Sequence, residues 1–279
     1  MMKRTVTKAR ISAFRTYLIR EEKSPATLDK YLRDVAAFAG FAGSRSVDKS
    51  LVVAYKSHLL ERGYAPRSVN SMLASVHSFL LFLGWGECRV KTLKLQKQIY
   101  ADEERELTKQ EYRQLLRAAG SQPRLRLVMQ TICGTGIRVS ELRYFTLEAV
   151  CRGELTVRCK GKNRRVLLPG KLRQLLLAYA KQERITSGII FRTVRGAPLD
   201  RKRIWAQMKC LCKAAGVAGS KVFPHNLRKL FARTFYTMEK DIAKLADILG
   251  HSSIDTTRIY IMSTGEEHRK KIERLGLVI

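Results

Sequence analysis

Apolar residues recur at helical spacing through the first 86 residues of the chain. The pattern predicts four helices, over residues 5–20, 25–38, 48–63 and 66–83. Ser24 followed by Pro25 is typical of an N-cap with proline at the first helical position, and Asp48 is a similar cap before the third helix. Four amphipathic helices in succession predict a small helical bundle over residues 1–86.

The hydrophobic pattern lapses between residues 87 and 106. This stretch is rich in Lys and Glu, which is typical of an extended linker. Thr108 and Glu111 then have the spacing of a capping box, and Leu107 and Tyr112 have that of a hydrophobic staple. We therefore expect a second domain over residues 107–279.

The second domain is expected to be rich in helix and to contain one small sheet. Apolar residues alternate with polar ones over residues 155–159, turn residues follow at 161–163, and residues 166–168 form a return strand. Further helices are predicted at 172–182 and 200–215, with a short edge strand at 189–191. The predicted fold class is mainly α: an amino-terminal four-helix domain and an α-rich second domain with a small β-hairpin.

The net charge of the chain indicates the class of partner that it binds. The chain has 54 Lys and Arg against 24 Asp and Glu, a formal net charge of +30 and a pI near 10.3. Excess charge of this size repels itself in a compact fold, so a polyanion is expected, with double-stranded DNA favoured over an anionic membrane surface. No run of 18 apolar residues and no secretory signal is visible in the sequence, which predicts a cytoplasmic, nucleoid-associated protein.

The cysteines do not indicate a metal site. They lack CxxC spacing and a nearby histidine partner, which favours buried free thiols, and we expect neither metal nor cofactor. The six are Cys88, Cys133, Cys151, Cys159, Cys210 and Cys212.

The stretch from residue 223 to residue 260 holds the candidate chemistry. His225 and Arg228 are three positions apart, so on a helix they share one face. Residues 241–249 form a compact amphipathic pattern that Gly250 ends, which places His251 at a helix end.

A short helix is predicted to follow that turn. Ser252 and Asp255 have the spacing of a capping box, and the helix would carry Tyr260 near its far end. Far upstream, Arg138 follows two glycines in ICGTGIRVSEL and opens another apolar-periodic run.

Four motifs occur in a fixed order: GTGIRVSEL around Arg138, HNLR from His225 to Arg228, LGH ending at His251, and a tyrosine nine residues later. In this combination the chain resembles the tyrosine recombinase (phage integrase) family, in particular its compact, Xer-like two-domain members. The resemblance covers nearly the whole chain. It implies that residues 1–86 are a core-binding, SAM-like DNA-binding domain and that residues 107–279 are catalytic.

The resemblance also implies the site residues. The expected catalytic set is Tyr260, Arg138, Lys160, His225, Arg228 and His251. In the family a lysine on the hairpin reaches the DNA beside the scissile phosphate; Lys160 matches that position best and Lys162 remains possible. Arg67, Asn70 and Lys162 are candidate DNA contacts, although polar residues on an amphipathic helix are often only solvated.

These residue types suit strand transfer on DNA. Tyr260 would attack the scissile phosphate and keep its bond energy in a phosphotyrosyl link, so no ATP is needed. Arg138 and Arg228 would clamp the nonbridging oxygens, because a guanidinium is always charged and fork-shaped. His225 would act as general base and His251 would orient the phosphate. Lys160 would protonate the departing oxygen.

The tail ends in apolar Leu275, Leu277, Val278 and Ile279. The resemblance implies that this tail docks into a neighbouring protomer, so that four copies, or this chain with a related recombinase, assemble on two DNA sites; folding back onto its own domain is the alternative. The expected function is site-specific recombination through a Holliday junction. A type IB-like topoisomerase and a catalytically inactive DNA-binding regulator are the alternatives.

One departure from the Xer pattern bears on the subgroup. Many members have a histidine directly after the second arginine, where this chain has Lys229. The departure leaves integration, excision and dimer resolution open, and a mobile-element integrase is a plausible assignment.

Overall fold

The computed structural model describes residues 4–96, 99–159, 162–275 and 277. The chain divides into two compact units, Met1–Lys97 and Gln98–Ile279. The fold is mainly helical, with a small antiparallel sheet in the second unit, as the sequence predicts. Within the described ranges, no helix is long and apolar enough to cross a membrane.

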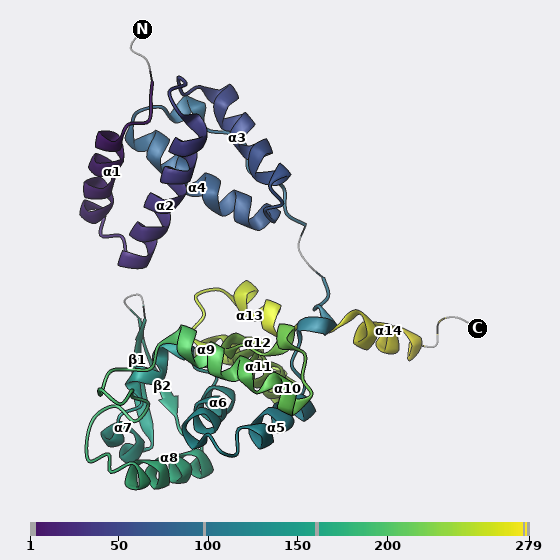
Figure 1. The fold of residues 1–279 in the computed structure, drawn as a ribbon. Helices are drawn as coiled ribbons and strands as arrows, with labels where there is room; N and C mark the ends of the chain where they lie inside the picture. Colours follow the sequence, from purple (N-terminus) through teal and green to yellow (C-terminus); the bar gives the residue numbers. More distant parts are fainter. Residues whose placement is uncertain (1–3, 97–98, 160–161, 276, 278–279) are drawn as a thin grey trace. The chain divides into compact units, whose positions relative to one another are not determined.

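Helices build the amino-terminal unit, and its core lies between them. They are α1 (Lys8–Arg20), α2 (Pro25–Ala42), α3 (Lys49–Glu61) and α4 (Pro66–Phe82), drawn from purple to blue in Figure 1. The predicted caps are confirmed: the Ser24 side chain accepts from the Thr27 N–H, and Asp48 accepts from the Leu51 N–H. The α2 and α4 helices pack against each other over buried Val35, Phe38, Leu73, Val76 and Phe79.

The first half of the segment expected as a linker packs against this unit. Trp85, Cys88 and Val90 are buried in the same core cluster as α3 and α4 side chains. The Asn70 amide donates to the Leu93 carbonyl and accepts from the Leu93 N–H, both at 2.8 Å. Asn70 therefore fixes the exit of the chain from the bundle.

The second half of that segment packs against the second unit. Glu106 is buried and pairs with Lys229 at 2.6 Å and with Arg233 at 3.7 Å. The Ala101 N–H donates to the Ser263 carbonyl at 2.9 Å. The residues that lead into the second unit are therefore anchored on α11 (Pro224–Glu239) and on the segment that follows α13 (Ile254–Ile261).

The second unit contains the sheet and the remaining described elements. They are η2 (Glu103–Arg105), α5 (Lys109–Ala118), α6 (Pro123–Thr135), η3 (Val139–Tyr144), α7 (Leu147–Arg152), β1 (Glu154–Cys159), β2 (Lys162–Leu167), α8 (Gly170–Gln182), α9 (Arg201–Cys210), α10 (Cys212–Ala215), η4 (Gly219–Lys221), α11 (Pro224–Glu239), α12 (Ile242–Leu249), α13 (Ile254–Ile261) and α14 (Gly265–Glu273); the short turn η1 (Gly86–Cys88) belongs to the first unit. The predicted capping box of Thr108 and Glu111 is confirmed at the start of α5. Helix α6 packs along α11, and this pair supports the candidate site (Figure 1).

Several local predictions are corrected by the structure. Cys159 pairs with Lys162 across the hairpin, so Lys162 and Asn163 belong to β2 and not to the turn. Residues 189–191 form an isolated bridge to Thr146 instead of a strand, because only Ile189 pairs there. The helix expected over residues 200–215 is interrupted at Leu211.

Two further expectations also change. The cap of α13 is Ser253, whose side chain accepts from the Asp255 N–H, because Ser253 and not Ser252 is the extended residue directly before the helix. The cysteine prediction is wrong for Cys151 and Cys210, which are exposed, since each lies on the solvent side of a surface helix. Across the described part of the chain, no group of three or more His, Cys, Asp or Glu residues could hold a metal ion.

Candidate active site

The site is built around the carboxyl end of α12. Gly250 has φ +64° and ends the helix, as predicted; its N–H donates to the Asp247 carbonyl and the His251 N–H donates to the Ala246 carbonyl, both at 3.0 Å. These two hydrogen bonds use the carbonyls of residues 246 and 247. The last three carbonyls, of residues 248–250, are left to find partners outside the helix.

Three arginines supply those partners. Each carbonyl accepts from a different guanidinium, one from β2, one from α11 and one from the residue before η3. The pairs are Ile248 with Arg164 at 2.5 Å, Leu249 with Arg228 at 2.7 Å, and Gly250 with Arg138 at 3.2 Å. The carboxyl end of a helix carries partial negative charge, so it favours cations at this place.

A buried carboxylate offsets the repulsion among these cations. Glu141 is 3% exposed, and it accepts from the Arg138 guanidinium at 3.0 Å and from the Arg138 N–H at 2.8 Å. Its other contact is the Arg164 guanidinium at 2.5 Å. A buried carboxylate is costly unless it is paired, and here both oxygens are paired with donors.

Sequence reasoning missed Glu141 and Arg164. Glu141 had a local signal, because it lies three residues after Arg138 and can fold back onto it. Arg164 had none, because its partners lie 23 and 84 positions away in the sequence.

Arg228 is enclosed by the protein. Its side chain is 1% exposed, and it also donates to the Gly136 carbonyl. Gly136 has φ +64°, and a side chain there would collide with the Phe231 ring, so the close approach of α6 and α11 needs glycine. Burial, followed by the nearby Arg138, lowers the pKa of Arg228 to about 10, which keeps it charged at neutral pH.

His251 lies directly after the helix end. Its Nε2 is 2.9 Å from the Arg228 guanidinium and its Nδ1 is 2.8 Å from the Thr257 hydroxyl. Because arginine only donates, Nε2 is the acceptor, and the Nδ1–H donates to Thr257. Burial, followed by Arg228 and Arg138, lowers the pKa of His251 to about 4, so the ring is neutral at pH 7.

Tyr260 and His225 complete the cluster. The Tyr260 ring is 8% exposed, and its centroid lies 5.0 Å from the His225 ring and 4.9 Å from the His251 ring. Pro224 begins α11, which places His225 in the first turn and Arg228 one turn later on the same face. The structure therefore brings together Arg138, His225, Arg228, His251 and Tyr260.

His225 is also held neutral. Its ring is accessible from the adjoining pocket, yet the surrounding protein atoms remove much of its water. This desolvation, followed by the charges of Lys229 and Arg228, lowers the pKa of His225 to about 4. A neutral imidazole beside a tyrosine can accept a proton.

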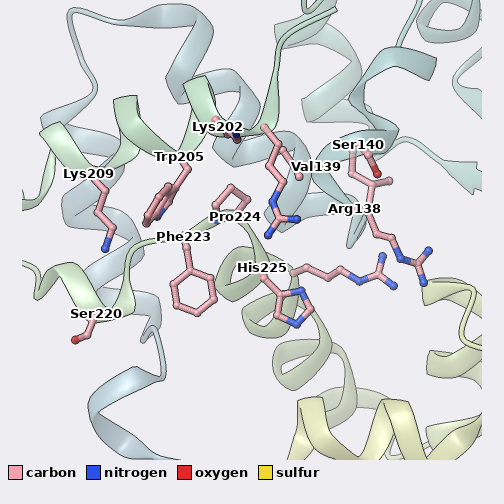
Figure 2. A pocket seen from close by; sticks show the side chains of 13 residues that line it. Arg138, Val139, Ser140, Lys202, Trp205, Lys209, Ser220, Phe223, Pro224 and His225 are labelled. Atoms are coloured by element: carbon pink, nitrogen blue, oxygen red, sulfur yellow. The ribbon is translucent and has the colours of Figure 1, made fainter. Parts of the chain in front are cut away.

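A pocket of about 800 Å³ opens beside His225. Figure 2 shows Trp205 and Lys209 of α9 on one side, Arg138 on the other and His225 between them. Of the described residues that line it, none is acidic, while Arg138, Arg201, Lys202, Lys209 and Arg228 are basic. The pocket is therefore suited to an anion such as a phosphodiester.

The remaining predicted residues lie outside this cluster. Lys160 falls outside the described residues, and for Lys162 only the backbone, paired with Cys159, is described. Arg67 is exposed near the start of α4. Asn70 is in the amino-terminal unit, where its amide binds Leu93.

Taken together, a tyrosine beside two neutral histidines and two arginines is an arrangement suited to phosphoryl transfer. The sequence profile of the phage integrase family matches residues 105–267, and that of the phage integrase N-terminal SAM-like domain matches residues 11–87. The chain belongs to the phage integrase family, which confirms the resemblance seen in the motifs.

Named relatives agree with this assignment. The chain is 32% identical over 180 residues to the tyrosine recombinase XerA of Pyrococcus furiosus, covering 62% of each chain. It is 30% identical over 153 residues to XerD of Corynebacterium glutamicum, covering 52% of this chain and 50% of that one. The matches thus span between half and two thirds of these relatives.

Among solved structures, a lambda integrase tetramer bound to a Holliday junction matches with a TM-score of 0.76 and 20% identity, over 94% of this chain and 79% of that one. At this identity the likeness establishes the fold.

Proposed function

We propose that the protein is a site-specific DNA recombinase that cleaves and rejoins duplex DNA through a 3′-phosphotyrosyl intermediate and a Holliday junction. The observation that supports this most is the meeting of Tyr260, His225, His251, Arg138 and Arg228 at the end of α12, beside a cation-lined pocket.

In the cleavage step the Tyr260 hydroxyl oxygen attacks the scissile phosphorus, and the bond from phosphorus to the 5′ oxygen breaks. The phenol proton passes to His225, which is neutral because its pKa is about 4. The departing 5′ oxygen takes a proton from Lys160. Rejoining reverses both transfers, so no external energy source enters.

Arg138 and Arg228 stabilise the negative charge that grows on the nonbridging oxygens. Arg228 keeps its charge at neutral pH, and its Nε–H is buried and has no hydrogen-bond partner among the described residues. The helix end holds both guanidiniums in place before DNA arrives, and Glu141 also holds that of Arg138, which lowers the reorganisation needed in the reaction.

His251 contacts the phosphate after a change of tautomer. Its Nε2 accepts from Arg228 in the free protein, and a phosphate oxygen needs a donor at this atom. The Thr257 hydroxyl can donate to Nδ1 as well as accept from it, so the proton can move to Nε2 without loss of the Thr257 contact.

Double-stranded DNA is the partner, and four protomers, or this chain with a related recombinase, assemble on two synapsed sites. The net charge of +30 and the exposed apolar side chains of Leu275 and Leu277 support this assembly. Lys162 and Arg67 contact the DNA backbone. The protein acts in the cytoplasm, on the nucleoid, and a mobile element is its plausible setting.

The test is covalent capture on DNA. A nicked duplex library that contains sequence flanking the gene is incubated with wild type and with Tyr260→Phe, and covalent complexes are separated under denaturing conditions. A covalent complex with wild type alone supports the proposal. Tight DNA binding by wild type without any covalent complex would favour an inactive DNA-binding regulator instead.

A tail deletion separates the recombinase from a type IB-like topoisomerase. Removal of residues 275–279 should spare cleavage of the captured duplex and reduce strand exchange between two duplexes. Relaxation of supercoiled DNA by the truncated protein at the rate of the full chain, with no exchange by either, would favour the topoisomerase.

A further inference from the structure

Arg164 joins three elements of the site through one side chain. It projects from β2, and its Nη1 donates to the Ile248 carbonyl at the end of α12, at 2.5 Å. Its Nη2 donates to Glu141 of η3, also at 2.5 Å. The side chain is 12% exposed, so both contacts are largely shielded from water.

The fit around Arg164 leaves the helix end little room to shift. Gly250 has φ +64°, and a Cβ atom on it would lie 2.6 Å from the Arg164 Cδ. The Arg164 stem therefore packs directly on the turn that follows α12. Movement of this side chain would disturb the position of Gly250 and of His251 after it.

The contacts that orient Arg138 depend on the groups that Arg164 holds. The Arg138 guanidinium donates to Glu141 at 3.0 Å and to the Gly250 carbonyl at 3.2 Å. Glu141 and the helix end are also the two groups that Arg164 joins. If one of them shifted, the direction of the Arg138 guanidinium would change.

We propose that Arg164 is a positioning residue for strand transfer: it fixes the separation between Glu141 and the end of α12, and thereby aims Arg138 at the scissile phosphate. This inference rests on the function proposed above. A fork is needed because the two acceptors lie on different elements, and an ammonium at the end of a lysine cannot reproduce the planar pair of donors. A displacement of about 1 Å at a reacting group can cost about 10²-fold in rate.

The test compares Arg164→Lys with Arg165→Lys. Arg165 is the next residue of β2, and its exposed side chain pairs with Glu154 only on the surface, so its replacement is the matched control. Cleavage is measured in a single turnover, at saturating DNA, on the nicked duplex captured with wild type. DNA affinity and melting temperature are measured on the same preparations.

A second substrate separates positioning from general stability. It carries a neutral methylphosphonate at the scissile position. The transition state then carries less negative charge, so cleavage depends less on Arg138. We expect Arg164→Lys to lose about 10²-fold in cleavage of the normal duplex and less than about 10-fold on the methylphosphonate, with DNA affinity unchanged. Arg165→Lys should match wild type on both.

Two results would overturn the inference while leaving the proposed function intact: wild-type cleavage by Arg164→Lys, or an equal loss on both substrates together with a lower melting temperature, which would indicate a structural role alone. Failure of wild type to form any covalent complex that depends on Tyr260 would instead overturn the proposed function, and this inference with it.

Discussion

The fold places two groups of cations at the candidate site in opposite ways. Arg138, Arg164 and Arg228 lie at the carboxyl end of α12, where partial negative charge attracts cations. Arg201 and Lys202 lie in the first turn of α9, at the amino end, where the helix dipole disfavours them.

The difference separates two roles. The cations at α12 are tied to carbonyls and to Glu141, so the fold itself holds them in one geometry. Arg201 and Lys202 are exposed, and the fold gains nothing from their charge. We infer that the first group is fixed for chemistry and that the second provides affinity for a polyanion.

The largest effect is expected at Arg228, one of the three arginines held at the end of α12. Arg228→Lys keeps the charge and loses the fork, in which Nη1 donates to the Gly136 carbonyl while Nη2 reaches the Leu249 carbonyl and His251. Covalent capture should fall by about 10³-fold, because removal of one preorganised donor from a transition state costs about 10²–10³-fold. The measurement is single-turnover cleavage of the nicked duplex.

DNA affinity is the control for that variant, and it should change by less than about threefold, since exposed cations provide most of the binding. Arg233→Lys is the matched variant, because Arg233 lies on the same helix and binds Glu106 and Glu267 away from the pocket. If Arg228→Lys lost DNA affinity along with cleavage, the cations at α12 would also provide affinity, and the two groups would not have separate roles.

The next effect concerns His225, the base that desolvation and the nearby cations keep neutral. His225→Gln should lower cleavage by about 10²-fold, because glutamine cannot accept a proton. With wild type at DNA concentrations below the dissociation constant, the rate should stay constant from pH 7.5 down to 5.5, since the pKa of His225 is about 4. A histidine with the ordinary pKa of about 6.5 would lose about tenfold over that range.

A smaller effect is expected on stability. The pKa values of His225 and His251 are both lowered to about 4 in the folded chain. Between pH 6.5 and 4 the unfolded chain therefore binds more protons, so the free energy of unfolding should decrease as the pH falls through this window. Urea unfolding at several pH values measures this slope, and His251→Gln should make it shallower.

The sequence predicted what depends on neighbours along the chain. Ser24, Asp48 and the Thr108 capping box were readable because a cap and its helix are adjacent. The site was predicted from motif order. The expected linker was harder, because only the tertiary structure shows that Cys88 and Val90 are buried.

What the sequence could not reveal depends on contacts between distant segments. The tautomer of His251 follows from the Arg228 donor, which is 23 positions away. The Arg164 bridge requires the register of β2 and the end of α12 at the same time. Hydrophobic periodicity carries no information about either contact, since both involve polar atoms that meet only after folding.

The smallest effect is expected at the exposed cations Arg201 and Lys202. Here DNA affinity and the free energy of unfolding should change in opposite directions. Arg201→Ala should weaken DNA binding a few-fold and reduce the dependence of log affinity on log salt by about 0.9, if one phosphate contact is lost. The same change removes a cation from the amino end of α9, so the free energy of unfolding should rise by about 0.3–1 kcal/mol at low salt.

Arg152→Ala is the matched control with the opposite sign. Arg152 is exposed in the last turn of α7, where the helix dipole favours a cation, and it does not line the pocket. Its loss should lower stability slightly and leave DNA affinity and its salt dependence unchanged. If both variants weaken binding equally, the charge of the whole protein and not the placement of Arg201 determines affinity, and the second group loses its separate role.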